Sequence, residues 1–581
     1  MHRKICILFL VILLVSPSFA LKNTTIYLTA VQETDEGYRG ALATLNVNIM
    51  NGSGYVYIDT WPLTKIDTQA SVRIAKQVAC NLIERDCSNH DFYYVIRSES
   101  QIVGGPSGGA AITIATLASL LDLNISNKVF ITGTINPDGT IGPVSGLLEK
   151  LSVVAKENGT LFLIPEGQSK LEIEKSNGNI IVTSSTSEEI DLVNYAKTHY
   201  NITVIEVKTI QEAFRYFTNY KFIEKDASFR KTKQYQKVME RMNNELYQHA
   251  KKLQEECKKN LNSYEVPYPY YTQIEELCNT PMDKSYTNMN IGNYYSSASI
   301  AFSNSIKYRY GLNLISLLNS KNKKIFVKNY ITHLEKQIKE PNTTNIELYA
   351  IVEERLSEAE NNIEFAWKNY YNTDYMKSVY YSSLSEERLY TANLWEDYSE
   401  DFPDYLIVPK DLKETARELL SEAYSILTYA SLSTSSQSYL EKSKELLKQA
   451  EENYDGGRYY ASVIFSLKSI ALGEISANIG YNDLDYLIKL HKKKARLVLN
   501  KTNSIIGQSY YEYAETLENE DKNSALIYYV YAEKLSNLQK IFDKTKKIQS
   551  MKMNEYVEPV KCKCFLNELI GFVISIFRTL L

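Results

Sequence analysis

A serine in a glycine-rich turn is the first residue of this chain whose setting suggests chemistry. Residues 102–111, IVGGPSGGAA, lie between a β-type run and a run of small apolar residues, with Ser107 near the centre. A serine at a strand-to-helix turn projects its hydroxyl outward, beside the unpaired N–H groups of the first helical turn. Such groups stabilise the oxyanion that forms when a serine attacks a carbonyl carbon. Taken alone, the turn fits a structural bend as well as a nucleophile.

A nucleophilic serine needs a base within hydrogen-bond reach. Beyond the N-terminal leader, the region up to residue 222 has two histidines, His90 in CSNHD and His199 in KTHYN, and neither belongs to a recognisable Ser-His-Asp pattern. The other option is a buried lysine, because burial disfavours the charged form and lowers the pKa. Lys150 is that candidate, although a lysine on an amphipathic helix commonly extends to solvent. The apolar face of its helix consists of Leu147, Leu148, Leu151 and Val154.

The elements that must position these residues alternate between short β-type runs and amphipathic helices. Runs of β-branched and aromatic residues predict strands at 24–32, 41–50, 52–60, 92–100, 127–135, 140–144 and 160–167. Apolar residues three and four apart predict helices at 68–85, 109–123 and 145–159, and a final βα pair at 202–217. The pattern is typical of a mixed α/β domain that ends near residue 222.

Three segments, in this order, resemble the proteolytic domain of Lon-type proteases: GGPSGGAA at 104–111, ITGTINPDGTIGPVSGLLEKL at 131–151 and LFLIPEG at 161–167. In that family a Gly-Pro-Ser turn carries the nucleophile, and a helix after a Thr-Gly strand and a hairpin carries a catalytic lysine. The resemblance covers roughly residues 24–222. It implies that Ser107 is the nucleophile, that Lys150 is the base, and that Thr132 hydrogen-bonds the lysine and holds it in position.

The sequence departs from the family pattern at three positions. Gly104 stands where many Lon enzymes have Asp, Thr134 where many have Glu, and Ser145 where the first glycine of a pair is expected. These departures leave the serine and the lysine in place. The pattern is more similar to stand-alone exported or membrane-attached members of the superfamily than to the cytosolic ATP-driven ones.

The turn itself predicts how the reaction would proceed. Gly105, Pro106 and Gly108 shape the turn around Ser107, and the backbone N–H groups near Gly105, Ser107 or Gly108 are the candidate oxyanion donors. The strand at 93–103, just before the turn, is predicted to pair with an extended substrate by strand addition. The sequence has no Gly-x-x-x-x-Gly-Lys-Ser/Thr phosphate loop and no His-Glu-x-x-His cluster. We therefore expect an ATP-independent enzyme without a metal or another cofactor.

The first twenty residues, MHRKICILFLVILLVSPSFA, have the positive end, apolar stretch and small-residue cleavage site of a secretory signal. An uncleaved membrane anchor is the alternative. Six cysteines follow it, and an even number in an exported chain suggests disulfides. The expected pairs are Cys80 with Cys87 and Cys257 with Cys278, whereas Cys562 and Cys564 are too close to interpret.

Residues 223–560 have almost no strand signal and long stretches of helical periodicity. They contain a loose repeat in which Tyr294, Tyr375 and Tyr459 align, each at the start of a run of small and aromatic residues, with a weaker copy from Asn523. The repeat predicts helical hairpins built for packing, a groove for extended chains or a partner, or both. The chain as a whole has 46 tyrosines against 18 phenylalanines, and tyrosine suits half-buried helix interfaces.

The last segment, residues 561–581, is mostly apolar but short for a membrane span. It either packs on the helical domain, lies in a membrane interface or seals a homo-oligomer. The net charge of −4 is spread over 581 residues, with no basic stripe that would predict nucleic-acid binding.

The sequence therefore predicts an exported or cell-envelope serine endopeptidase with a Ser107–Lys150 dyad, protein or peptide substrates and a helical domain for substrates or partners. The predicted organisation is a signal at 1–20, a Lon-like domain at 21–222, a helical domain at 223–560 and the apolar segment at 561–581. Two alternatives remain: a non-catalytic interaction protein on a Lon-like scaffold, and a protease that cuts only itself near residues 220–235.

Overall fold

The computed structural model describes residues 23–34, 37–103, 105–176, 179–181, 188–223, 225, 228–343, 345–401, 409–433, 436–538 and 540–542. The predicted signal, Gly104, the pair Cys562 and Cys564, and the apolar segment at 561–581 lie outside these residues. Among the described helices, none is both long enough and apolar enough to cross a membrane.

The chain forms two compact units. The first consists of Met1–Lys225, Ala423–Ser443 and Leu472–Asp483, and the second of Asp226–Glu422, Lys444–Ala471 and Leu484–Leu581. Two short stretches of the C-terminal half thus cluster with the N-terminal unit. The domain limits at 20, 222 and 560 stay predictions.

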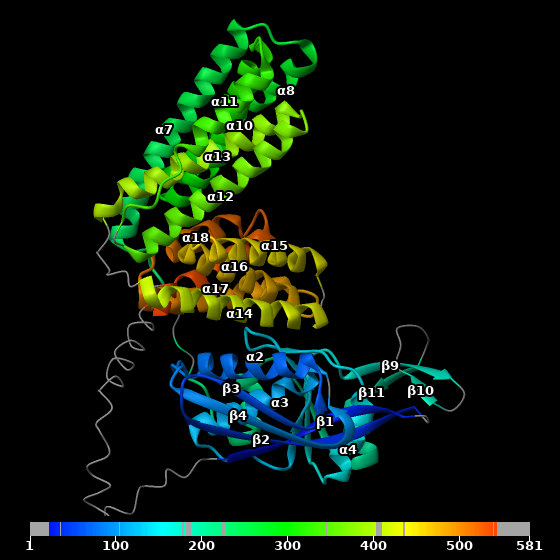
Figure 1. Ribbon diagram of the computed structural model, residues 1–581. Coiled ribbons are helices and arrows are strands. Elements are labelled where there is room, and N and C mark those ends of the chain that lie inside the picture. Colours follow the sequence, from blue (N-terminus) through cyan, green and yellow to red (C-terminus); the bar gives the residue numbers. More distant parts are fainter. Residues whose placement is uncertain are drawn as a thin grey trace, which may run out of the picture. The chain divides into compact units, whose positions relative to one another are not determined.

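A four-stranded sheet in the order β1-β2-β4-β3 forms one layer of the first unit (Figure 1). Its strands are β1 (Asn23–Thr34), β2 (Gly37–Asn51), β3 (Val56–Thr64) and β4 (His90–Val103). β1 and β4 each pair with β2 in antiparallel fashion, and β3 pairs with β4 in parallel. Alternate residues of β2 are buried, as the period of two of a half-buried strand requires.

Two helices pack together beside this sheet: α2 (Ile66–Leu82) and α3 (Gly109–Leu121). α3 also contacts β1 and β2, and 11 of its 13 residues are buried. Most residues around the whole circumference of α3 are small or β-branched. They allow β1, β2 and α2 to pack closely against it. A helix that is apolar all round belongs in a core, and this one carries the serine turn at its N-terminus.

A second layer contains a parallel sheet in the order β12-β8-β5, made of β5 (Val129–Ile131), β8 (Leu161–Pro165) and β12 (Thr203–Val207). A two-stranded hairpin, β6 (Thr134–Ile135) and β7 (Ile141–Gly142), follows β5. A small antiparallel sheet comprises β9 (Lys170–Ser176), β10 (Asn179–Ile181) and β11 (Glu188–Asp191). The helices are α4 (Leu147–Lys156), α5 (Leu192–Tyr200) and α6 (Ile210–Thr218). These elements confirm the mixed α/β class.

The strand before the serine turn, at 93–103, was predicted to pair with an extended substrate, and this prediction needs correction. Residues 90–98 of β4 pair with β2 on one edge and residues 92–97 pair with β3 on the other. A strand that is bonded on both edges cannot accept an added strand. Along this length, substrate pairing with β4 is therefore excluded in this structure.

The second unit is helical, which confirms the class predicted for the C-terminal half. The helices are α7 (Lys233–Ser263), α8 (Tyr268–Cys278), α9 (Asp283–Asn290), α10 (Tyr294–Asn319), α11 (Lys323–Glu335), α12 (Ile346–Tyr371), α13 (Tyr375–Asp397), α14 (Pro409–Ser433), α15 (Gln437–Asp455), α16 (Tyr459–Asn478), α17 (Leu484–Thr502), α18 (Ile505–Leu517) and α19 (Lys522–Leu535). Parts of α14, α15 and α16 belong to the first unit. Extensive pairings join α12 to α13, α7 to α10 and α18 to α19.

The sequence repeat corresponds to a structural repeat. The aligned Tyr294, Tyr375 and Tyr459 are the first residues of α10, α13 and α16. Three residues later in each copy, a buried serine contacts the residue twelve positions earlier in the chain. Ser378 donates to the Ala366 carbonyl at 2.8 Å and Ser462 to the Ala450 carbonyl at 2.7 Å, while Ser297 lies 3.0 Å from the hydroxyl of Ser285. The small side chains thus bring each helix close to the one before it.

Both predicted cysteine pairs are disulfides in the structure. Cys80–Cys87 ties the end of α2 to the loop before β4. Cys257–Cys278 joins α7 to α8.

Candidate active site

The serine turn lies between the end of β4 and the start of α3. Pro106, Ser107 and Gly108 form a single 3-10 turn, and Gly109 begins the helix. Gly105 has a φ of 104°, a conformation that favours glycine. A Cβ on Gly109 would lie 2.5 Å from Cγ2 of Ile135 and 2.9 Å from its backbone N. Glycines therefore allow the chain to turn sharply and allow the β6–β7 hairpin to contact the turn.

One N–H group of the turn already donates to a protein side chain, and two others are candidate oxyanion donors. The Gly105 N–H donates to Oδ2 of Asp67 at 3.0 Å, so in this structure it is not directed at a substrate. Pro106 has no N–H. The N–H groups of Ser107 and Gly108 belong to the first helical turn, where backbone donors have no intrahelical acceptor. They remain the best-placed candidates for an oxyanion hole.

Asp67 is a site residue that the sequence reasoning missed. It lies in the first turn of α2, and its Oδ1 also accepts the Thr68 N–H at 2.6 Å. One carboxylate thereby accepts an N–H group of the first turn of α2 and holds the residue two positions before Ser107. An acidic residue just inside a helical start was visible in the sequence, but its link to the turn 38 residues later was not.

The resemblance implies that Thr132 hydrogen-bonds Lys150, whereas the structure places its hydroxyl against the Ser107 backbone. Thr132 follows β5, and its hydroxyl donates to the Ser107 carbonyl at 3.4 Å. The next N–H, of Gly133, donates to the same carbonyl at 3.0 Å. Two donors thus fix the Ser107 backbone, and Thr132 positions the serine turn.

Lys150 is buried on the inner face of α4. Its exposed fraction is 2%, and it shares this face with Leu147, Leu151 and Val154, which pack in a cluster with Phe130 and Phe162. Burial lowers the pKa of the Lys150 amine to about 8, against a smaller opposing effect of the Glu149 carboxylate. A substantial fraction of the side chain is therefore neutral just above neutral pH, as a general base requires.

Strand β1 lies against both the serine turn and the lysine helix. Leu28 is 3.8 Å from the position that a Cβ on Gly108 would occupy, and Val31 is 2.4 Å from the equivalent position on Gly146. Gly146 directly precedes α4 and has a φ of 69°. Leu28 and Val31 are three residues apart, roughly 10 Å along a strand. A single strand therefore supports the two segments that carry Ser107 and Lys150.

The two histidines have other surroundings. His90 begins β4, whereas the serine turn follows the other end of this strand, about 40 Å away for an extended chain of that length. His199 is exposed at the end of α5, stacked on Tyr195 with ring centroids 4.0 Å apart. Within the described part of the chain, no three His, Cys, Asp or Glu side chains gather as a metal ligand set.

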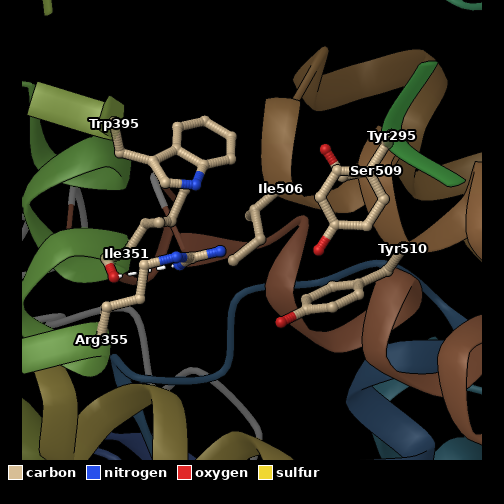
Figure 2. Close-up of a pocket in the computed structure, with 7 residues that line it drawn as sticks. All are labelled: Tyr295, Ile351, Arg355, Trp395, Ile506, Ser509 and Tyr510. Atoms are coloured by element: carbon tan, nitrogen blue, oxygen red, sulfur yellow. Dashed lines mark hydrogen bonds between the residues drawn. The ribbon is translucent and has the colours of Figure 1, made fainter. Parts of the chain in front are cut away.

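The helical unit has a small aromatic pocket of its own (Figure 2). Its lining residues are Tyr295, Ile351, Arg355, Trp395, Ile506, Ser509 and Tyr510. The Arg355 guanidinium lies over the Trp395 ring at 5.3 Å and donates to the Ile351 carbonyl at 3.2 Å. The side chains fill the pocket so closely that no room remains for a water molecule. This pocket is therefore not the groove for extended chains that the repeat predicted.

Comparison with known proteins places the N-terminal unit in a family context. Residues 37–186 match the Lon protease (S16) C-terminal proteolytic domain. The chain is 30% identical over 147 residues to the Lon protease of Buchnera aphidicola, which covers 24% of this chain and 19% of that protein. It is 25% identical over 182 residues to the Lon protease of Clostridium beijerinckii, covering 30% and 20%. It is also 25% identical over 105 residues to the archaeal Lon protease of Methanocaldococcus jannaschii, covering 18% and 16%. The match spans about a fifth of the length of these relatives.

Proposed function

We propose that this protein is a serine endopeptidase in which Ser107 is the nucleophile and Lys150 is the general base, because residues 37–186 match the Lon protease (S16) C-terminal proteolytic domain. The observation that carries the proposal is the burial of Lys150 on α4, which lowers its pKa to about 8. A lysine that served only solubility would extend to solvent.

In the proposed reaction, neutral Lys150 takes the proton of the Ser107 hydroxyl as the oxygen attacks a peptide carbonyl carbon. The N–H groups of Ser107 and Gly108 stabilise the tetrahedral oxyanion. Lys150 then gives its proton to the departing amine, and the C–N bond breaks to leave an acyl ester on Ser107. Water, deprotonated by Lys150, hydrolyses this ester and regenerates the serine.

Several residues of this chain hold the serine in place for that attack. Thr132 and Gly133 donate to the Ser107 carbonyl, and Asp67 accepts the Gly105 N–H. These bonds fix the turn before substrate arrives, and fixed geometry supplies much of the rate of such reactions.

We further propose that the enzyme is exported and works without ATP on unfolded or extended proteins. The leader of residues 1–20, the disulfides in both units and the absence of a phosphate-loop motif in the sequence support this proposal. The helical unit would bind substrates or partners, and homo-oligomers and membrane association through the leader or residues 561–581 belong to the same proposal.

A second candidate function is a non-catalytic scaffold whose helical repeat binds a partner in the cell envelope. The regular repeat of α10, α13 and α16 motivates it, together with Gly104 in place of an acid.

The test is cleavage of an unstructured protein by the chain without its leader, in the absence of ATP, from pH 6 to 10. Ser107→Ala and Lys150→Ala should both abolish cleavage. Lys156→Ala is the matched control, because Lys156 is exposed at the end of the same helix and its loss should change little. Equal activity of all four proteins on several substrates would contradict the dyad, and equal inactivity would favour the scaffold.

A further inference from the structure

The tip of the β6–β7 hairpin is held by a residue from the far C-terminal half of the chain. Asn478, the last residue of α16, donates through Nδ2 to Oδ2 of Asp138 at 2.8 Å. Its Oδ1 lies 3.2 Å from the hydroxyl of Thr140. Residues 472–483 and the hairpin belong to the same compact unit. The contact joins positions 340 residues apart in the chain.

This contact is a built and fully enclosed polar site. Asn478 has an exposed fraction of 1%, Asp138 of 6% and Thr140 of 0%. Oδ1 of Asp138 accepts the N–H and the hydroxyl of Thr140 at 2.8 and 2.7 Å, which leaves Oδ2 for Asn478. A buried carboxylate that lost this donor would remain partly desolvated, a costly state.

A second side chain of the C-terminal half, on α14, also supports the hairpin. Tyr429 is fully buried, and its hydroxyl lies beside the Thr134 side chain and the backbone of Ile135. The α14 and α16 segments also pack on each other, since a Cβ on Gly473 would lie 2.8 Å from Cγ2 of Ile426. The described residues 423–433, 436–443 and 472–483 are here called the clamp, which therefore contacts both the strand and the tip of the hairpin.

The hairpin in turn contacts the serine turn directly. Gly133, immediately before β6, donates its N–H to the Ser107 carbonyl at 3.0 Å and accepts the Ala110 N–H at 3.1 Å. Asn136 bonds the Thr140 carbonyl through its backbone and the Thr140 hydroxyl through its side chain, both at 3.0 Å. Hydrogen bonds at the tip, the covalent chain of β6 and the Gly133 N–H thus connect Asn478 with the Ser107 carbonyl.

We propose that the clamp positions the nucleophile turn and that Asn478 is a positioning residue for the protease. The inference rests on the proposed function. It gives one part of the C-terminal half a role that needs no contact with substrate: it holds the hairpin, and through Gly133 it holds the Ser107 backbone. Loss of the clamp lowers the rate of the chemical step and leaves substrate binding intact, because the groups it displaces act on the attacking serine.

The test uses the full chain without its leader and three changes at this contact. Asn478→Ala should lower kcat about 10-fold, with KM changed less than about 2-fold, as expected for a small misplacement of reacting groups. Asn478→Asp should lower kcat further, since it places two carboxylates side by side. The double change Asp138→Asn with Asn478→Asp should restore most of the rate, because the amide and the carboxylate merely exchange sides. Ser462→Ala is the control: it removes a buried hydrogen bond of the same helix outside the clamp, to the Ala450 carbonyl at 2.7 Å, and should leave kcat unchanged.

Amide hydrogen exchange gives a second measurement that needs no activity. Peptides that cover residues 105–110 and 130–142 should exchange at least about 10-fold faster in Asn478→Asp than in the unchanged chain or in Ser462→Ala. Rescue of both kcat and exchange by the double change would support the clamp. Unchanged exchange in these peptides, or faster exchange with unchanged kcat, would overturn it. If the unchanged chain and Ser107→Ala are equally inactive, the proposed function fails, and the exchange result still decides whether Asn478 holds the hairpin.

Discussion

Two lysines with little solvent exposure, one in each unit, have pKa values that are shifted in opposite directions. Lys150 in the N-terminal unit has apolar neighbours, and burial lowers its pKa to about 8. Lys468 on α16 in the helical unit has 13% of its side chain exposed, but the carboxylate of Glu354 pairs with it, and together with Glu358 this raises its pKa to about 12. Tyr510 and Tyr531 contribute ring faces, each 5.6 Å from the Lys468 amine.

The difference shows that burial alone does not identify a catalytic lysine. Desolvation lowers the pKa in both cases, and the partner decides the outcome. Lys468 is held charged and is suited to structure. Lys150 lacks such a partner among the described contacts, so its neutral form is accessible near neutral pH. Four sets of substitutions test this difference between the two lysines and the role of the serine turn.

The largest effect is expected from exchanging the two lysines for methionine. Lys150→Met should lower kcat/KM for protein cleavage by at least about 10³-fold, because it removes the general base. Lys468→Met should leave the rate within about 3-fold, provided that folding is verified by thermal unfolding. A comparable loss of activity in both variants would contradict the assignment of different roles.

Breaking the pair in the helical unit should cost stability. Glu354→Gln leaves the charged Lys468 without its main partner and should lower the free energy of unfolding by about 3 kcal/mol. Urea titration measures this change, and Glu364→Gln, at an exposed position on the same helix, is the control. If the two variants unfold alike, Glu354 is not the source of the raised Lys468 pKa.

Lys150→Met should also stabilise the fold, by an amount that depends on pH. The pKa of Lys150 falls from 10.5 to about 8 on folding, so the cost of a buried charge is fully present below pH 8 and vanishes above pH 10.5. Lys150→Met should therefore raise the free energy of unfolding by up to about 3 kcal/mol at pH 7. The gain should shrink between pH 8 and 10.5. A gain that does not depend on pH would show that the pKa of Lys150 is the same in the folded and unfolded states.

The smallest effect concerns the carboxylate at the serine turn. Asp67→Ala should lower kcat about 10-fold by releasing the Gly105 N–H, and Asp67→Asn should recover most of it because its carbonyl still accepts. Asp91→Ala is a matched control, since Asp91 holds another loop of the unit by accepting the Ser53 and Tyr55 N–H groups at 2.8 and 2.9 Å. Equal rates for Asp67→Ala and Asp91→Ala would remove Asp67 from the site.

Local signals in the sequence predicted much of the fold. The serine turn, α4 with Lys150, the turn at residues 137–139 and the repeat tyrosines at the starts of α10, α13 and α16 all depend on neighbours close in the chain. The cysteine pairs were equally accessible, because short separations leave few alternatives.

Contacts between distant segments could not be predicted in this way. Asp67 reaches Gly105 across 38 residues, and Asn478 reaches Asp138 across 340. The pairing of β4 on both edges also depends on two other strands, so its exposure could not be inferred from its own residues. Such features follow from tertiary packing. Hydrophobic periodicity and turn residues do not show which distant segments will be in contact.

The most direct measurement is the pH dependence of Ser107 modification by a fluorophosphonate, with the site identified by mass spectrometry. The reagent forms a bond between Oγ and phosphorus, releases fluoride and requires the serine proton to be removed. With Lys150 as the base, the rate should rise with a midpoint near pH 8, and Lys150→Met should lose this reaction. No modification of Ser107, or the same rate and profile in Lys150→Met, would contradict the dyad.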